Sequence, residues 1–366
     1  MFRLSLIVVS WAVFTLGASG ADKLPKPDRI PAPATPEQAA LIREGVALHD
    51  QQDYAGAIAK YKQVLAENPW EVTALHELAF TYFASKDFEG ALATARLGAQ
   101  CRSRLLPLFY GMIGNALDEL GRGGEAIETY RVAIKQSPDV GILHYNLAVS
   151  LRRTGKQVEA KAEVEKALQC DPGHASSHAL LAAIYRDLGY RVPAIMAYSR
   201  FLILEPESPR SVQVLQTLLD LLTQGVGKGK NPNEITIFMA DPSKAHKDEG
   251  DFGSVEMMMS ILTAADIIKP SAEEAKLPPK SAFERVVARY SSMGEALENS
   301  KLKGGFAATY YAPYFAALAK AGHTEAFAAY ALKGGQLEGS AEWAQANAEK
   351  VDGFLAWSKA YQWPGK

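Results

Sequence analysis

Apolar residues recur every three or four positions between Glu37 and Leu222, the spacing of helices that bury one face. A longer period lies over this one, because Pro138, Pro172 and Pro206 follow one another at intervals of 34 residues. A proline ends one helix and starts the next segment of chain. The pattern therefore predicts a series of short helices arranged in units of about 34 residues.

Five units share one frame of small and large side chains when they are aligned on these prolines. The small position of the first helix is Gly45, Ala79, Gly114, Ala148 or Ala182, followed three residues later by Leu48, Tyr82, Leu117, Leu151 or Tyr185. The small position of the second helix is Ala57, Ala91, Ala126, Ala160 or Ala194, followed four residues later by Tyr61, Ala95, Tyr130, Val164 or Tyr198. Paired helices approach closely only where small side chains meet, so each unit is predicted to be a helix–turn–helix pair.

This frame resembles the tetratricopeptide-repeat family over about residues 37–206. The resemblance implies an all-α, right-handed solenoid in which stacked pairs build one continuous core. Gly121, Gly155 and Gly189 fall where the first helix must stop and the chain must turn. The second unit departs from the pattern, with Ser103 in place of the last proline and one extra residue, which predicts a looser or bent joint.

The sequence predicts a different organisation on either side of the repeats. A helix starting at Ser208 and Pro209 is expected to cap the solenoid, which assigns residues 37–224 to five repeats plus this helix. A glycine- and lysine-rich run from 225 to 233 predicts a boundary, followed by a mostly helical domain over 225–366 of unknown function. Within it we expect a short strand in 234–240 and helices over 254–268, 281–300, 306–320, 324–332 and 340–361.

The N-terminus has the pattern of a signal peptide. Arg3 precedes an apolar run, and Ala18 to Ala21 provide the small residues of a cleavage site, so residues 1–21 are predicted to be removed. Residues 22–36 are rich in proline and are expected to form an extended, unpacked linker. The mature protein is therefore expected in the periplasm or outside the cell, with no integral membrane segment. A net charge of −2 argues against general binding to nucleic acid.

Chemical motifs are weak throughout the chain. Cys170, His174 and His178 have a metal-like spacing, but His144 and His178 occupy one repeat position where a packing residue is normal. The glycine run at 225 lacks the spacing of a phosphate loop, and the polar stretch of Asp241, His246, Asp248, Glu249 and Asp251 is expected to be a solvated loop. No catalytic motif is recognisable, so we expect no enzyme activity, cofactor or metal, and Cys101 and Cys170 are expected to be unbonded.

The repeats supply the candidate binding site. In the family, the first helix of each pair lines a concave surface that holds a partner peptide. By repeat position, the residues of this surface are His76, Phe80, Phe83, Asn115, Tyr145, Asn146, Arg152, Arg153 and Arg186. Arg152 and Arg186 share one position in successive repeats and suit carboxylates. The family's clamp for chain ends keeps Asn115 but lacks its lysines, which argues against capture of a peptide terminus.

Two functions remain open at the level of sequence. The first is protein or peptide binding and scaffolding through the concave groove. The alternative is small-ligand binding or enzyme activity in the C-terminal helical domain, for which a deep pocket with convergent polar groups would be the sign. The many aromatic residues of that domain are expected to build its core, although Trp363 could instead be an exposed contact residue.

Overall fold

The computed structural model describes residues 24–229, 234–237, 248–268, 279–300, 302–335 and 337–365. The predicted signal peptide lies outside these residues. The chain divides into two compact units, one ending at Val132 and the other beginning at Ala133. Residue 225 lies inside the second unit, and the domain boundary expected there stays a prediction.

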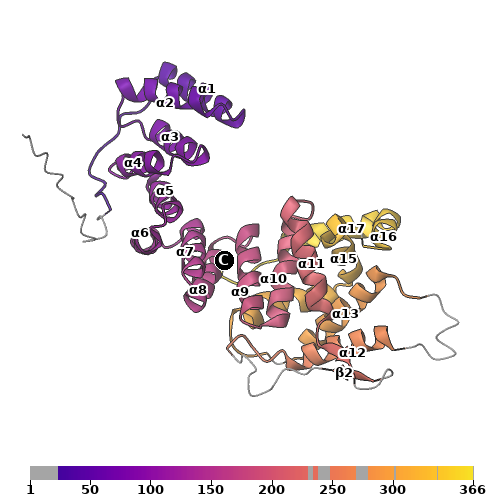
Figure 1. The fold of residues 1–366 in the computed structure, drawn as a ribbon. Helices are drawn as coiled ribbons and strands as arrows, with labels where there is room; N and C mark the ends of the chain where they lie inside the picture. The colour runs from indigo at the N-terminus through magenta and orange to yellow at the C-terminus, as the bar shows by residue number, and fades with distance from the viewer. Residues whose placement is uncertain are drawn as a thin grey trace, which may run out of the picture. The chain divides into compact units, whose positions relative to one another are not determined.

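The first unit is built from helix pairs, as the frame predicts. The pairs are α1 (Pro36–Asp50) with α2 (Tyr54–Glu67), α3 (Val72–Ala84) with α4 (Phe88–Gly98), and α5 (Leu106–Glu119) with α6 (Gly123–Gln136), the last of which runs across the unit boundary. The helices of a pair lie side by side (Figure 1). The capping box at the start of α1 is present, because Thr35 and Gln38 satisfy one another's backbone N–H groups.

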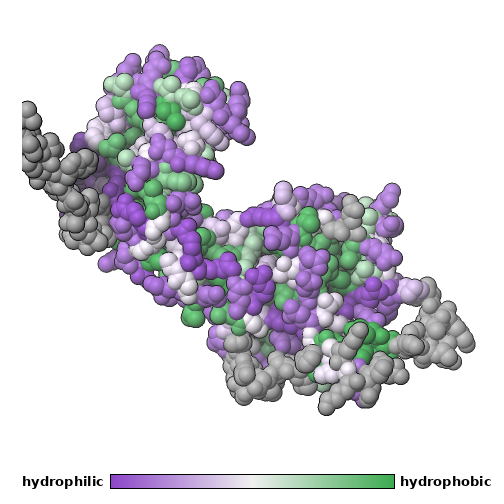
Figure 2. Space-filling model, in the orientation of Figure 1, coloured by the Kyte–Doolittle hydropathy of each residue, from purple (hydrophilic) through white to green (hydrophobic). Residues whose placement is uncertain are grey.

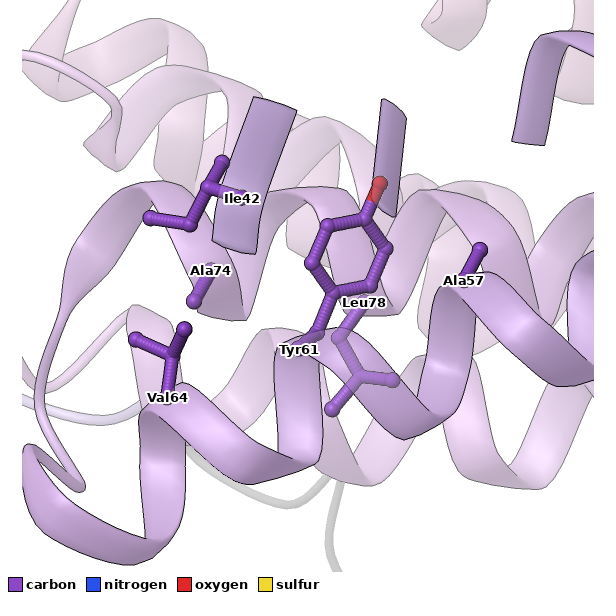
Figure 3. Packing of buried hydrophobic residues seen from close by; sticks show 6 residues of the cluster. All are labelled: Ile42, Ala57, Tyr61, Val64, Ala74 and Leu78. Carbon is purple, nitrogen blue, oxygen red and sulfur yellow. The ribbon is translucent and has the colours of Figure 1, made fainter. Parts of the chain in front are cut away.

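The predicted crossings of small residues hold the pairs together. A β-carbon on Gly45 would lie 2.5 Å from the Tyr61 ring, so glycine is what lets α1 and α2 come this close. Figure 3 shows the Tyr61 ring lying among the other apolar side chains of the cluster, which are Ile42, Ala57, Val64, Ala74 and Leu78. Ala160 and Ala194, in the later pairs, are also fully buried. The all-α solenoid core is therefore confirmed.

The turn within each pair requires one residue in the left-handed backbone conformation. Gly121, Gly155 and Gly189 have φ between +76° and +84°, as a glycine turn requires. The same position in the first two repeats is taken by Gln52 and Lys86, whose φ values are 64° and 65°. These two side chains hold a conformation that costs free energy for any residue except glycine.

At the joint after the second pair, Gly98 allows the Phe109 ring to pack directly against α4, so the joint is not looser there, and a bend at this place stays a prediction. One expectation for the first unit is wrong. The proline-rich segment is not unpacked in its described part. The Arg29 backbone N–H donates to Gln100 over 3.0 Å, and the Arg29 carbonyl accepts from the Arg102 N–H over 2.8 Å. The Arg29 guanidinium also lies 3.9 Å from the Trp70 ring centroid.

The second unit contains the last two pairs and the C-terminal region. The pairs are α7 (Gly141–Arg153) with α8 (Gln157–Cys170) and α9 (Ala175–Asp187) with α10 (Arg191–Leu204), and α11 (Pro209–Thr223) follows as the expected additional helix. A short antiparallel hairpin, β1 (Val226–Lys228) and β2 (Ile235–Ile237), comes next. The remaining elements are α12 (Gly253–Ile267), α13 (Ala282–Asn299), the π-helix η2 (Ala307–Tyr311), α14 (Ala312–Lys320), α15 (Thr324–Ala331), the 3₁₀ turn η3 (Lys333–Gly335), α16 (Ser340–Ala346) and α17 (Ala348–Ala360).

Three C-terminal elements differ from the predicted ones. The glycine run at 225, predicted to be a boundary segment, forms β1 in part. The helix over 306–320 starts with a π-helical turn, because Pro313 has no N–H to donate back into the preceding turn. The helix over 340–361 is broken at Asn347, whose backbone leaves the helical region and whose side-chain amide donates to the Trp343 carbonyl over 2.9 Å.

The C-terminal helices α12 and α15 and the turn η2 complete the covering of α10 that α9 and α11 begin. Every residue from Val192 to Ile203 is buried, where a second repeat helix would ordinarily keep one solvated face. The Ser199 and Tyr290 hydroxyl groups, both buried, lie 2.6 Å apart and join α10 to α13. The chain end returns to α8, where Gly365 lies beside Gln169 (Figure 1). The C-terminal region and the last two pairs therefore share one core.

Candidate protein-binding face

The first helices of the second unit form a continuous face through side-chain contacts. Tyr145 on α7 meets the His174 ring edge-on at 4.8 Å between centroids. At the other end, Arg152 Nη2 donates to Asp187 Oδ2 over 2.8 Å, joining α7 to α9. We call the face formed by these helices and α11 the first-helix face; its residues are Tyr145, Asn146, Arg152, Arg153, His174, Ser176, Arg186, Asp187 and Arg210.

The third helix of this face is connected in the same way. Arg210 Nη1, at the start of α11, donates to Ser176 Oγ on α9 over 3.0 Å. Arg210 also pairs with Glu205, which raises the pKa of Arg210 and lowers that of Glu205. Polar and aromatic contacts thus extend over α7, α9 and α11 in the order of the elements.

Two guanidinium groups share one carboxylate on this face. Arg186 Nη2 donates to Asp187 Oδ1 over 2.8 Å, while Arg152 holds the other oxygen. Although burial raises the pKa of the Asp187 carboxyl, the hydrogen bonds from both arginines lower it overall. One carboxylate neutralises one of the two charges. The pair that sequence reasoning expected to stack is thus brought together, and positive charge remains at the surface, where Arg186 is 42% exposed.

The rings at the aromatic end of the face are uncharged, and the Arg210 guanidinium beside them is paired with Glu205. Burial lowers the pKa of His174, so the ring is neutral at pH 7, and His174 Nδ1 lies 2.7 Å from Ser177 Oγ. Tyr145 and Asn146 are half-buried beside it. The face therefore offers an amphipathic patch at one end and guanidinium groups at the other.

The candidate residues of the first unit are placed unevenly. Phe80 is 45% exposed and stacks on the His49 ring at 5.0 Å, whereas Phe83 is half-buried and packs against Phe88. His76 lies edge-on to Phe109. Of the nine candidates, His76, Phe80, Phe83 and Asn115 lie in the first unit and the other five lie in the second. The two groups are therefore considered as separate surfaces.

Asn115 has a structural partner. Its Oδ1 accepts a hydrogen bond from the Tyr130 hydroxyl over 2.6 Å, which ties α5 to the second helix of the same pair. Figure 2 shows hydrophilic and apolar residues interspersed over the surface of the first pairs, with Phe80 among the exposed apolar side chains. In the first unit, Phe80 is thus the candidate that is most available to a partner.

Comparison with known proteins assigns the repeats. One tetratricopeptide-repeat family model matches residues 48–100 and a second matches residues 112–175. The repeats over residues 48–100 and 112–175 belong to the tetratricopeptide-repeat family. A 76-residue segment is 37% identical to the TPR repeat-containing thioredoxin TTL4 of Arabidopsis thaliana, and it spans 21% of this chain and 11% of that protein.

Solved tetratricopeptide-repeat structures resemble about half of the chain. TTC0263, a thermophilic protein of Thermus thermophilus, covers 50% of this chain and 98% of its own length, with 21% identity and a TM-score of 0.43. PilF of Pseudomonas aeruginosa covers 50% and 85% respectively, with 20% identity and a TM-score of 0.44. YrrB, described as having an unusual peptide-binding site, covers 48% and 89%, with 17% identity and a TM-score of 0.37.

The histidines of the fourth and fifth tetratricopeptide repeats pack in the core, as their shared position predicts. His178 Nδ1 lies 2.7 Å from the Tyr311 hydroxyl and Nε2 lies 3.0 Å from the Pro172 carbonyl oxygen. Complete burial lowers the pKa of His178 to about 3. His144 is buried in the same manner between Glu163 and the Pro138 carbonyl. Among the described residues, no group of three potential ligands could hold a metal ion.

In the described part of the acidic stretch, Asp248 and Asp251 are exposed, but Glu249 is not, which corrects the prediction of a solvated loop for that residue. Glu249 is 1% exposed, accepts from the Tyr185 hydroxyl over 3.0 Å and from the Ala307 N–H over 2.8 Å, and pairs with Lys161 of α8. The Glu165 side chain lies beside this group, with Oε1 3.7 Å from Lys161 Nζ. Burial and the neighbouring Glu249 raise the pKa of Glu165 to about 7.

Sequence reasoning missed Asp187, His174 and Arg210 as members of the first-helix face. Asp187 follows Arg186 directly, and Arg210 lies 34 residues after Ser176, the repeat interval. Lys161 and Glu249 are 88 residues apart and carry no such signal.

Proposed function

We propose that the chain is an exported tetratricopeptide-repeat protein that binds a protein or peptide partner and has no enzymatic activity. The observation that carries the proposal is the first-helix face of the second unit. There, Arg152 and Arg186 share the carboxylate of Asp187 at one end of the face, and the neutral rings of Tyr145 and His174 lie at the other end. Guanidinium groups bind carboxylates through two parallel hydrogen bonds, so the expected partner segment is acidic and carries an apolar side chain.

Export is the other part of the proposal, supported by the positive, apolar and small-residue order of the N-terminus. Within the described ranges, no helix is long and apolar enough to cross a membrane. The proposed location is the periplasm or the exterior of the cell. Sequencing the N-terminus of the mature protein from each cell fraction tests this: cleavage near Ala21 is expected, and a cytoplasmic protein that keeps residues 1–21 would refute it.

The binding proposal is tested by quantitative affinity capture with the mature protein. The variant Arg152→Glu with Arg186→Glu reverses the charge of the face. Lys156→Glu with Lys303→Glu changes the net charge equally at exposed residues outside it and serves as the matched control. We expect the amount of partner recovered with the first variant to fall at least tenfold, and the amount recovered with the control to be unchanged. Equal recovery with both variants would contradict a role for this face.

A further inference from the structure

A cavity of about 480 Å³ lies between α10 and the C-terminal end of the chain, in the second unit. Its lining residues come from α10, the turn before α9, α17 and the residues after α17. They include Arg200, Ile203, Leu355, Ser358, Lys359 and Trp363. A volume of this size accommodates a small organic molecule. The cavity is separate from the first-helix face, because no residue of that face lines it.

Arg200 is a buried charge at this cavity without an ionic partner. The residue is 7% exposed, and its Nη1 donates to Ser358 Oγ over 3.3 Å, a neutral hydroxyl. Its Nε is buried and has no hydrogen-bond partner, and no ion pair is formed with a described carboxylate. A buried cation without a counter-charge is costly, so an arrangement of this kind favours an incoming anion.

Aromatic rings hold the guanidinium group in place. The Trp363 ring centroid lies 4.8 Å from Arg200 Cζ and the Tyr314 centroid lies 5.7 Å away. Trp363 is 8% exposed, so it is not the exposed contact residue that its position near the chain end allowed. The two ring faces stabilise the positive charge without neutralising it. The charge is therefore oriented by packing and remains available to an acceptor.

The other walls determine what else the ligand carries. Ile203 and Leu355 provide apolar surface, and Lys359 is an exposed cation among the lining residues. One buried guanidinium matches one carboxylate, whose two oxygens fit its planar fork.

We propose that this cavity binds a small organic carboxylate, with the carboxylate group on Arg200 and an apolar or aromatic body against Trp363 and Leu355. The ligand would be a monoanion small enough for about 480 Å³. This site does not depend on the proposed protein binding, because it uses α10 and α17 and not the first helices of the repeats.

Calorimetry on the full chain tests the proposal, with tryptophan fluorescence as a second readout since Trp363 lines the site. The probes are benzoate and phenylacetate, and the neutral isostere benzamide distinguishes charge recognition from simple filling of the cavity. Arg200→Met removes the charge while keeping an unbranched side chain. Lys359→Glu repels the ligand at an exposed position, and Lys350→Glu is the matched control on the same helix, outside the cavity.

The expected result is that the carboxylates bind at least tenfold more tightly than benzamide, that Arg200→Met loses this preference, and that Lys350→Glu leaves affinity unchanged. If Arg200→Met does not fold, the proposal is tested with Lys359→Glu and with the cavity-filling Leu355→Trp. Both variants should bind benzoate severalfold more weakly than the parent. The proposal is overturned if no carboxylate binds at about 10 mM, or if benzamide binds as well as benzoate.

Discussion

Replacing Glu165 by glutamine should make the second unit more stable at pH 8 and leave it unchanged near pH 4. Glu165 lies on α8 beside the buried Lys161–Glu249 pair, and its Oε1 is a buried atom with no hydrogen-bond partner. Burial raises the pKa of its carboxyl to about 7 from the ordinary 4.5, with the negative charge of Glu249 as the next cause. Lys161 opposes this shift without cancelling it.

The sign follows from proton binding. Between pH 4.5 and pH 7 the folded state keeps the Glu165 proton that the unfolded state releases, so the free energy of unfolding falls as pH rises. Below pH 4.5 both states are protonated and no loss occurs. The difference between 4.5 and about 7 corresponds to a loss of about 3 kcal/mol, complete above pH 7. Glutamine cannot ionise and should avoid the loss.

Urea unfolding at pH 4 and pH 8 measures the effect, followed by tryptophan fluorescence because Trp343, Trp357 and Trp363 all belong to the second unit. The exposed Glu349, on α17 of the same unit, provides the control variant Glu349→Gln, which should behave as the parent at both pH values. A Glu165→Gln variant whose stability difference from the parent is the same at pH 4 and pH 8 would refute the reasoning.

Two further predictions concern the repeat backbone. Gly114→Ala should destabilise the first unit by about 1–3 kcal/mol in thermal or urea unfolding, because a β-carbon there would lie under 3.0 Å from the Tyr130 ring. Gly124→Ala, where nothing lies within 4 Å, should be neutral or slightly stabilising, and equal losses at both sites would contradict the crossing argument. Gln52→Gly or Lys86→Gly should stabilise by about 0.5–1 kcal/mol, since the left-handed turn then carries no side-chain penalty; a loss of stability would contradict it.

The repeats could be predicted from sequence because each of their contacts is local. Gly45 and Tyr61 are 16 residues apart, and the same spacing of a small and a large side chain returns in every pair except the second, where Ala95 takes the place of the large residue. The turn positions at Gln52 and Lys86 could not be recognised by residue type, since the neighbouring helices impose the left-handed conformation there.

The positions and order of the C-terminal helices could largely be predicted from the sequence, but their packing against the repeats could not. Ser281 and Glu284 predicted the start of α13, and the structure has that capping box. The burial of Glu249 and Arg200 could not be predicted, because their partners Lys161 and Ser358 are 88 and 158 residues away. A polar residue in the sequence does not show whether distant segments will cover it.

The complete enclosure of α10 has a consequence for how the protein is made. The segments after α11 that shield one side of this helix are synthesised after it, so a nascent or truncated chain ending at α11 leaves the side chains that α12, η2 and α15 would cover exposed. Such a fragment should associate with itself or with a chaperone instead of remaining monomeric. Fragments for binding studies should therefore end before α9 or retain the chain through Trp363.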